Sequence, residues 1–164
     1  MILTFSRLLD ELLDGSKKQT IRKAKIKNIE QNPRFFNYFN KRKMHPRNKQ
    51  EYIEMEMKYG RAYMDKNMPT LSIFWKNPRN GGMKIGRACI LGVMVCHTSD
   101  LTDDIARLDG FKGEHPLHEL YDAFDRMYGE GNWEGSTWEV VQWDWLEWPS
   151  PFTKEALKKK GLYP

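Results

Sequence analysis

Apolar and polar residues follow one another along the chain in blocks that predict short strands and amphipathic helices. Strands are expected at residues 2–5, 19–22, 71–75, 88–96 and 136–148. The nearly continuous apolar run 88–96 is typical of a central strand that is buried on both faces. Helices are expected at residues 8–13, 101–109 and 117–128, with another starting at Asn32-Pro33 and a short basic helix within 149–164. This order predicts an α+β domain built on a mixed or antiparallel sheet, or on a small barrel.

Local signals refine these elements. Ser6 is expected to cap the first helix and Gly15 to end it. In the last strand the apolar positions change parity at Val140-Val141, which predicts a β-bulge. Residues 53–59 leave two structures open, because apolar and polar residues alternate as in a strand while the Met and Glu content suits a helix.

Length and composition exclude several classes of protein. The 164 residues, 40% hydrophobic and 30% charged, predict one globular domain. Cys89 and Cys96 lie on one predicted strand, so they cannot form a disulfide with each other. No apolar run is long enough to cross a bilayer. We therefore expect a soluble, cytoplasmic protein that does not bind membranes.

No resident metal or cofactor is expected. Cys96-His97 lacks the second pair of ligands that a zinc site needs. Gly81-Gly82 lacks the Lys-Ser/Thr that follows a phosphate-binding glycine loop.

The net charge of +5 hides a strong segregation. Residues 16–50 hold 12 Lys/Arg and one acidic residue, Glu30, whereas residues 101–150 hold 3 Lys/Arg and 12 acidic residues. A segment this basic can neutralise several phosphates at once. It can equally form a solvated face or pack on the acidic half of the same chain. Charge alone leaves these interpretations open.

Two segments carry candidate chemistry. Lys17, Thr20 and Arg22 follow the end of the first helix, and a strand at 19–22 places Thr20 and Arg22 on one face, over which Lys17 can lean. A hydroxyl, a lysine and a guanidinium together can bind a phosphate or polarise a carbonyl. Basic residues after a helix are also favoured by the helix dipole. The second segment is Asp109-Gly110-Phe111, where a carboxylate lies at the end of a predicted helix and is a candidate functional group. The same three residues can equally form a turn, with Phe111 anchored in the core.

Taken together, Gly15-x-Lys17-x-x-Thr20-x-Arg22 and Asp109-Gly110-Phe111 resemble the two motifs of the ASCH domain family, which has a PUA-like fold. The second motif usually has Glu, so Asp109 is one methylene shorter. The resemblance covers residues 1–24 and 70–148. It implies a domain over 1–148 with a basic insertion at 25–69 and a tail at 149–164.

The family resemblance implies RNA binding in a cleft beside the barrel. Some members remove the acetyl group of N4-acetylcytidine, and one is described as a ribonuclease. Carried over by motif, the catalytic set is Lys17, Thr20 and Asp109: Thr20 attacks, Lys17 takes its proton, and Asp109 orients the lysine or relays the proton. Arg22 or a backbone amide would hold the oxyanion or a phosphate, with Gly15 and Lys18 among the binding residues.

The insertion favours single-stranded RNA over a free modified nucleoside, because its Lys and Arg alternate with aromatic residues. Candidate binding residues there are Lys41, Arg42, Lys43 and Arg47. Trp75 and Trp133 are expected to stack on bases, whereas the four tryptophans in 138–148 are expected in the core. Three functions remain: an RNA-binding domain, a hydrolase of an acylated base or of RNA, and a protein-interaction module.

Overall fold

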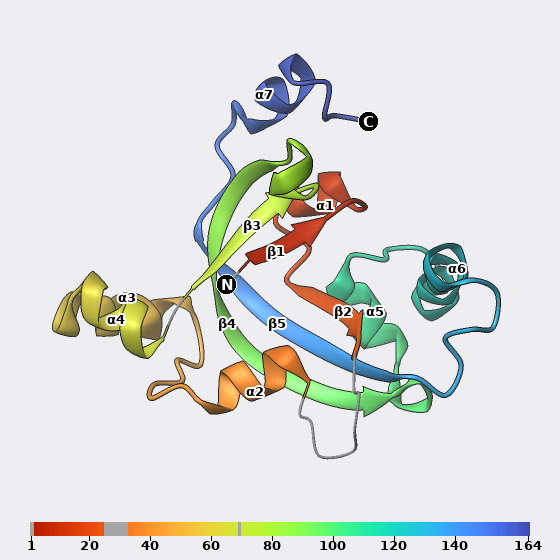
Figure 1. Cartoon of the computed structure of the whole chain (residues 1–164), viewed down its shortest axis with the longest axis horizontal. Coiled ribbons are helices and arrows are strands. Elements are labelled where there is room, and N and C mark those ends of the chain that lie inside the picture. Colours follow the sequence, from red (N-terminus) through yellow and green to blue (C-terminus); the bar gives the residue numbers. More distant parts are fainter. Residues whose placement is uncertain (1, 25–32, 69) are drawn as a thin grey trace. The chain divides into compact units, whose positions relative to one another are not determined.

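The computed structural model describes residues 2–24, 33–68 and 70–164 (Figure 1). Its strands are β1 (Ile2–Phe5), β2 (Gln19–Lys23), β3 (Leu71–Trp75), β4 (Met83–His97) and β5 (Thr137–Glu147). Its α-helices are α1 (Leu9–Leu13), α2 (Arg34–Asn40), α3 (Lys49–Tyr59), α4 (Arg61–Asn67), α5 (Asp103–Asp109), α6 (Pro116–Tyr128) and α7 (Thr153–Lys159). The strands form one mixed sheet in the order β1-β3-β4-β5-β2. The predicted α+β class is confirmed.

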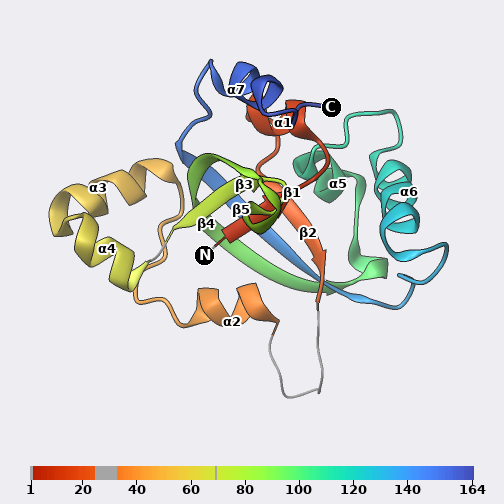
Figure 2. The same cartoon turned by 45° about the horizontal axis from the view of Figure 1, so that its top comes forward.

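The chain divides into two compact units, of which the first comprises residues 1–16, 42–91 and 143–164. In this unit β1 pairs in parallel with β3, and β3 pairs antiparallel with the first part of β4. Helices α3 and α4 lie side by side and bury Tyr52, Met64 and Met68 beside Cys89 (Figure 1). Figure 2 shows α7 next to α1, where Lys154 pairs with Asp10 at 3.5 Å.

The second unit comprises residues 17–41 and 92–142. Here β2 pairs antiparallel with β5, from Gln19 opposite Gln142 to Lys23 opposite Trp138. Helices α5 and α6 pack together, and α6 places Leu120 and Phe124 in the core. The rings of Phe124 and Trp138 stack at 4.0 Å between centroids. Phe111 packs against the same core, as expected for an anchor.

The ambiguous segment 53–59 is helical. Asn48 caps α3 by accepting a hydrogen bond from the backbone N–H of Glu51. The helix buries Tyr52 and leaves Met57 exposed. The alternation of apolar and charged residues that resembles a strand is therefore carried on a helix with a narrow buried side.

Three local predictions are wrong. Leu8, in the left-handed conformation, precedes α1 and no side chain caps that helix, so Ser6 is not its cap. The strand predicted at 88–96 is longer, and Met94 is exposed, so it is not buried on both faces throughout. No bulge occurs where β5 pairs with β2, because Val140 and Val141 keep continuous register; both are buried, which explains the parity change.

Other local predictions hold. Gly15 follows α1 with φ +74°, as expected for the end of that helix. Both cysteines are free. In the described part of the chain, no helix is both long and apolar enough to span a bilayer.

Candidate functional site

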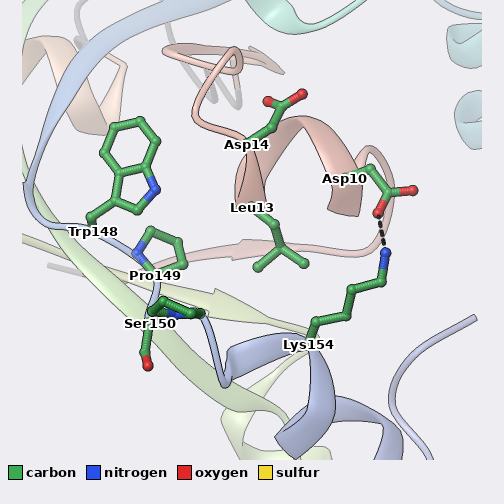
Figure 3. Close-up of a pocket in the computed structure, with 8 residues that line it drawn as sticks. Asp10, Leu13, Asp14, Trp148, Pro149, Ser150 and Lys154 are labelled. Carbon is green, nitrogen blue, oxygen red and sulfur yellow. Dashed lines mark hydrogen bonds and ion pairs between the residues drawn. The ribbon is translucent and has the colours of Figure 1, made fainter.

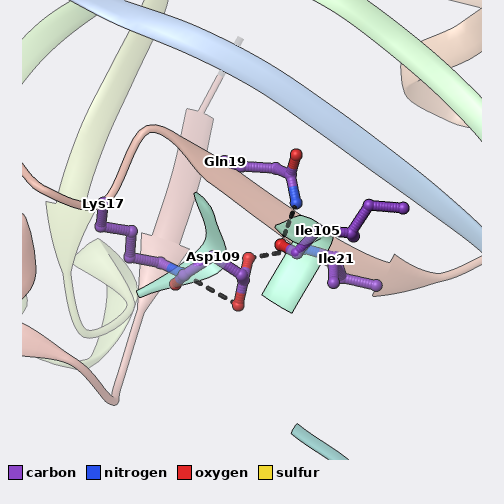
Figure 4. A network of polar contacts seen from close by, with 5 residues as sticks. All are labelled: Lys17, Gln19, Ile21, Ile105 and Asp109. Atoms are coloured by element: carbon purple, nitrogen blue, oxygen red, sulfur yellow. Dashed lines mark hydrogen bonds and ion pairs between the residues drawn. The ribbon is translucent and has the colours of Figure 1, made fainter. Parts of the chain in front are cut away.

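Lys17 and Asp109 form a buried ion pair in the second unit. Lys17 Nζ lies 3.0 Å from Asp109 Oδ2, and the side chains are 3% and 9% exposed. Lys17 Nζ also donates to the backbone carbonyl of Asp109. Figure 4 shows the two side chains pointing toward one another from residues 92 positions apart in the sequence. The shorter arm of aspartate therefore reaches the lysine.

Asp109 is held on its other side by the strand. Its Oδ1 accepts from the backbone N–H of Ile21 at 3.0 Å, and the carbonyl of Leu108 accepts from the N–H of Lys18. Gln19 Nε2 donates to the carbonyl of Ile105 at 2.8 Å (Figure 4). Asp109, at the end of α5, thus supplies an acceptor for the N–H of Ile21 on the edge of β2 that β5 does not pair. The same contacts that place Asp109 also attach the helix to the sheet.

Burial dominates the electrostatics of this pair. Loss of solvent raises the pKa of Asp109, whereas Lys17, the N–H of Ile21 and Arg22 act in the opposite direction. Burial also lowers the pKa of Arg22, opposed by Tyr128, Asp109 and Glu139. A lysine in contact with a carboxyl group of raised pKa has a proton acceptor beside it, as proton transfer requires.

Thr20 lies on β2 and is 6% exposed. The contacts that hold the Lys17–Asp109 pair, from Lys17 Nζ and from the N–H of Ile21, do not include the hydroxyl of Thr20. It shares a strand face with Arg22, as predicted. The structure thus brings together two of the three predicted catalytic side chains, Lys17 and Asp109. The third, Thr20, precedes Ile21, whose N–H donates to Asp109.

A separate pocket of about 700 Å³ lies in the first unit (Figure 3). The indole of Trp148, Pro149 and Leu13 form its apolar walls, and the Lys154–Asp10 pair lies at its rim. Trp148 is 49% exposed, unlike the buried Trp138, Trp143 and Trp145. The sequence places Trp148 directly before Pro149, outside the alternating positions of the strand, and this signal separates it from the other three.

Among the comparisons with known proteins, the matches are to solved structures. No family model matches the chain. No curated protein matches it. An ASCH domain from Lactobacillus crispatus matches with 15% identity and a TM-score of 0.46, over 90% of this chain and 80% of that one. The chain is similar in fold to this ASCH domain. A protein from Enterococcus faecalis assigned to the family model DUF984 matches with 10% identity and a TM-score of 0.47, over 87% of this chain and 71% of that one.

Among the other predicted binding residues, the exposed ones are Lys18, Lys41, Lys43 and Arg47. Arg42 is buried and donates to the carbonyl of Ile90 at 2.9 Å, so it supports the fold and is not exposed to a ligand.

The two tryptophans predicted to stack on bases are buried. Trp75 is 3% exposed and its Nε1 donates to the carbonyl of Leu162. Trp133 is 7% exposed and stacks on Tyr121 at 4.7 Å. Neither ring has an open face for a base, because each one fills the interior of its unit.

Gly15, the first residue of the ASCH-like motif, is required by packing. Its φ of +74° is strained for other residues, and a Cβ there would overlap the indole of Trp148. We expect Gly15→Ala to lower the free energy of unfolding by about 2–5 kcal/mol, from left-handed strain and overpacking together. Urea unfolding measures this change.

The matched control is Gly81→Ala. Gly81 has φ +78° with no atom within 4 Å of a Cβ, so it carries the strain without the overlap. We expect a loss of about 1–2 kcal/mol there. Equal losses at the two glycines would contradict the role of Trp148 in requiring Gly15.

Proposed function

We propose that the protein binds single-stranded RNA and hydrolyses an amide on an acylated base, with N4-acetylcytidine as the substrate to test. The observation that carries the proposal is the buried Lys17–Asp109 pair, whose carboxylate accepts from the N–H of Ile21, the residue that follows Thr20 in β2. A lysine and a carboxylate are seldom both buried unless paired, and a buried pair is weak evidence for stability. Perturbed ionisable groups in contact are common at catalytic sites.

Each residue of the pair has a distinct task in this reaction. The Lys17 ammonium group first passes a proton to the Asp109 carboxylate, and the neutral amine then accepts the proton of Thr20 Oγ as this oxygen attacks the amide carbonyl. Lys17 passes that proton to the nitrogen of the leaving base as the C–N bond breaks. Water then releases the acyl group from Thr20 as the free acid. Asp109 is a positioning residue, because the N–H of Ile21 fixes one carboxylate oxygen and leaves the other for Lys17. Arg22 supplies positive charge near the developing oxyanion.

The experiment that tests the reaction uses an RNA oligomer with one N4-acetylcytidine, with products identified by mass spectrometry. The expected product has lost one acetyl group and keeps its full length. Cleavage of the strand would instead indicate a ribonuclease. An unchanged oligomer, from protein that binds it, would exclude the hydrolase.

RNA binding without chemistry is the second candidate, and one observation favours it. Lys17 Nζ contacts both the carboxylate and the backbone carbonyl of Asp109, and the same carboxylate accepts from the N–H of Ile21 in β2. A pair with a purely structural role would have these contacts and need no hydroxyl beside it.

If the protein binds RNA, its affinity should fall as the salt concentration rises, to an extent set by exposed lysines that contact phosphate. Lys41 and Lys43 are exposed, whereas Arg47 is already paired with Glu51 at 3.2 Å. We expect the Lys41→Gln/Lys43→Gln variant to bind RNA more weakly, with a slope of log K against log salt that is smaller by about 1.4. Fluorescence anisotropy at several salt concentrations measures the slope.

The control for this variant is Arg126→Gln, an exposed cation on α6 within the acidic segment 101–150. It should leave the slope unchanged. If the lysine variant also keeps the wild-type slope, Lys41 and Lys43 do not contact phosphate.

A further inference from the structure

A second, smaller pocket of about 330 Å³ lies in the first unit between α3 and the strands β4 and β5. Its apolar walls are Ile53, Met57 and Leu146. None of the residues discussed so far as catalytic lines it. Its volume is near the lower end of that of small-molecule sites, about 300–1,000 Å³, and suits one flat ring system.

A buried donor and a buried acceptor line this pocket without hydrogen-bond partners. Arg87 is 8% exposed; its Nε lies 3.0 Å from Glu147 Oε1, but its Nη1 has no hydrogen-bond partner among the residues that the structure describes. Glu56 Oε2 is likewise buried without one in that part of the chain. Burial and the nearby Glu56 carboxylate raise the pKa of Tyr52, which therefore stays protonated. Unsatisfied buried groups of this kind are costly and call for a partner.

The charges of the pocket disfavour a simple anion. Arg61 and Arg87 both approach Glu147, at 3.5 and 3.0 Å, and Glu56 adds a second carboxylate. Two cations and two carboxylates leave no net charge. A neutral ligand that accepts from Arg87 and donates to Glu56 fits better than phosphate. The hydrogen-bond donor and acceptor of this ligand must lie on one edge, and the ligand must be flat enough to fit between the apolar walls.

We infer that this pocket binds a single unpaired cytosine or adenine. Each of these bases presents a ring-nitrogen acceptor beside an exocyclic amine on one edge, so Arg87 can donate to the ring nitrogen while Glu56 accepts from the amine. Uracil has no amine, and in guanine a ring N–H lies between O6 and the amine. The inference rests on the proposed RNA-binding function, to which it adds a base-selective subsite on the inserted helix α3.

The test compares wild type, Glu56→Gln and Glu54→Gln by calorimetric titration with the four ribonucleoside monophosphates, and by anisotropy with C-rich and U-rich oligomers. Glu54 is exposed on the same helix and accepts from Gln50, so its variant is the matched control. We expect wild type and Glu54→Gln to prefer CMP or AMP over UMP and GMP. Glu56→Gln, whose amide can donate where the carboxylate accepted, should lose that preference with about 10-fold weaker binding of the preferred base.

The outcomes separate this inference from the proposed function. RNA binding with equal affinity for all four monophosphates, or with Glu56→Gln indistinguishable from Glu54→Gln, overturns the subsite and leaves RNA binding standing. Selective binding of CMP or AMP without binding of any oligomer supports the pocket as a site for a free nucleotide and overturns the proposed RNA function. No binding of any monophosphate or oligomer overturns both.

Discussion

Replacing Lys17 by methionine should lower the free energy of unfolding by about 3–5 kcal/mol, because it leaves the Asp109 carboxylate buried without its counter-charge. Methionine keeps the length and much of the volume of lysine, so the loss reports on the charge more than on a cavity. Chemical denaturation followed by far-UV circular dichroism measures the change. A Lys17 variant that has lost activity therefore needs its fold checked first.

Two further variants make this prediction specific. Lys17→Met/Asp109→Leu removes both charges and should recover a large part of the loss, although the N–H of Ile21 then lacks its acceptor. Lys18→Met, at an exposed neighbour, should change stability by less than about 0.5 kcal/mol. If Lys17→Met is as stable as Lys18→Met, the ion pair has no structural role.

The Lys17–Asp109 pair shows how far the sequence alone leads. Spacing suggests that Lys17 can lean over the face of Thr20 and Arg22, but nothing in periodicity connects it to a residue 92 positions away. The resemblance of two short motifs does connect them. The physical reason for this contact lies at the edge of β2, where the N–H of Ile21 needs an acceptor and Asp109, at the end of α5, provides one.

Elements with strong local signals are predicted well. The helix at 117–128 and the strand at 71–75 have clear periodicity, and both are confirmed. Segment 53–59 was ambiguous because tertiary packing buries only one side chain of α3, Tyr52, among several apolar ones. Its cap, Asn48, lies outside the alternating stretch and is the signal that favours a helix.

Burial of particular side chains could not be predicted, because it depends on contacts between distant segments. Trp75 follows a strand near a turn, which suggests exposure, yet the backbone of Leu162 covers it. Arg42 belongs to a basic run that suggests a solvated surface, yet it donates to the carbonyl of Ile90 in β4. Arg87 adjoins the apolar run 88–96, and only the pocket beside α3 shows why a charge there matters.

The largest effect on turnover is expected from Thr20→Val. Valine has the shape of threonine and suits a strand, but it has no hydroxyl to attack the amide. We expect release of the acetyl group from the modified oligomer to fall by roughly 10⁴- to 10⁶-fold, as for loss of a nucleophile elsewhere. Single-turnover assays with mass-spectrometric detection measure the rate.

The same substitution should leave fold and binding almost unchanged. The Thr20 side chain is buried and valine has the same shape, so stability should stay within about 1 kcal/mol of wild type. RNA affinity should also be retained, which separates chemistry from binding in a way that Lys17 variants cannot. Thr20→Ser, which keeps a hydroxyl, should retain measurable turnover. A Thr20→Val protein that deacetylates at the wild-type rate would exclude Thr20 as the nucleophile and leave Lys17–Asp109 as a structural pair.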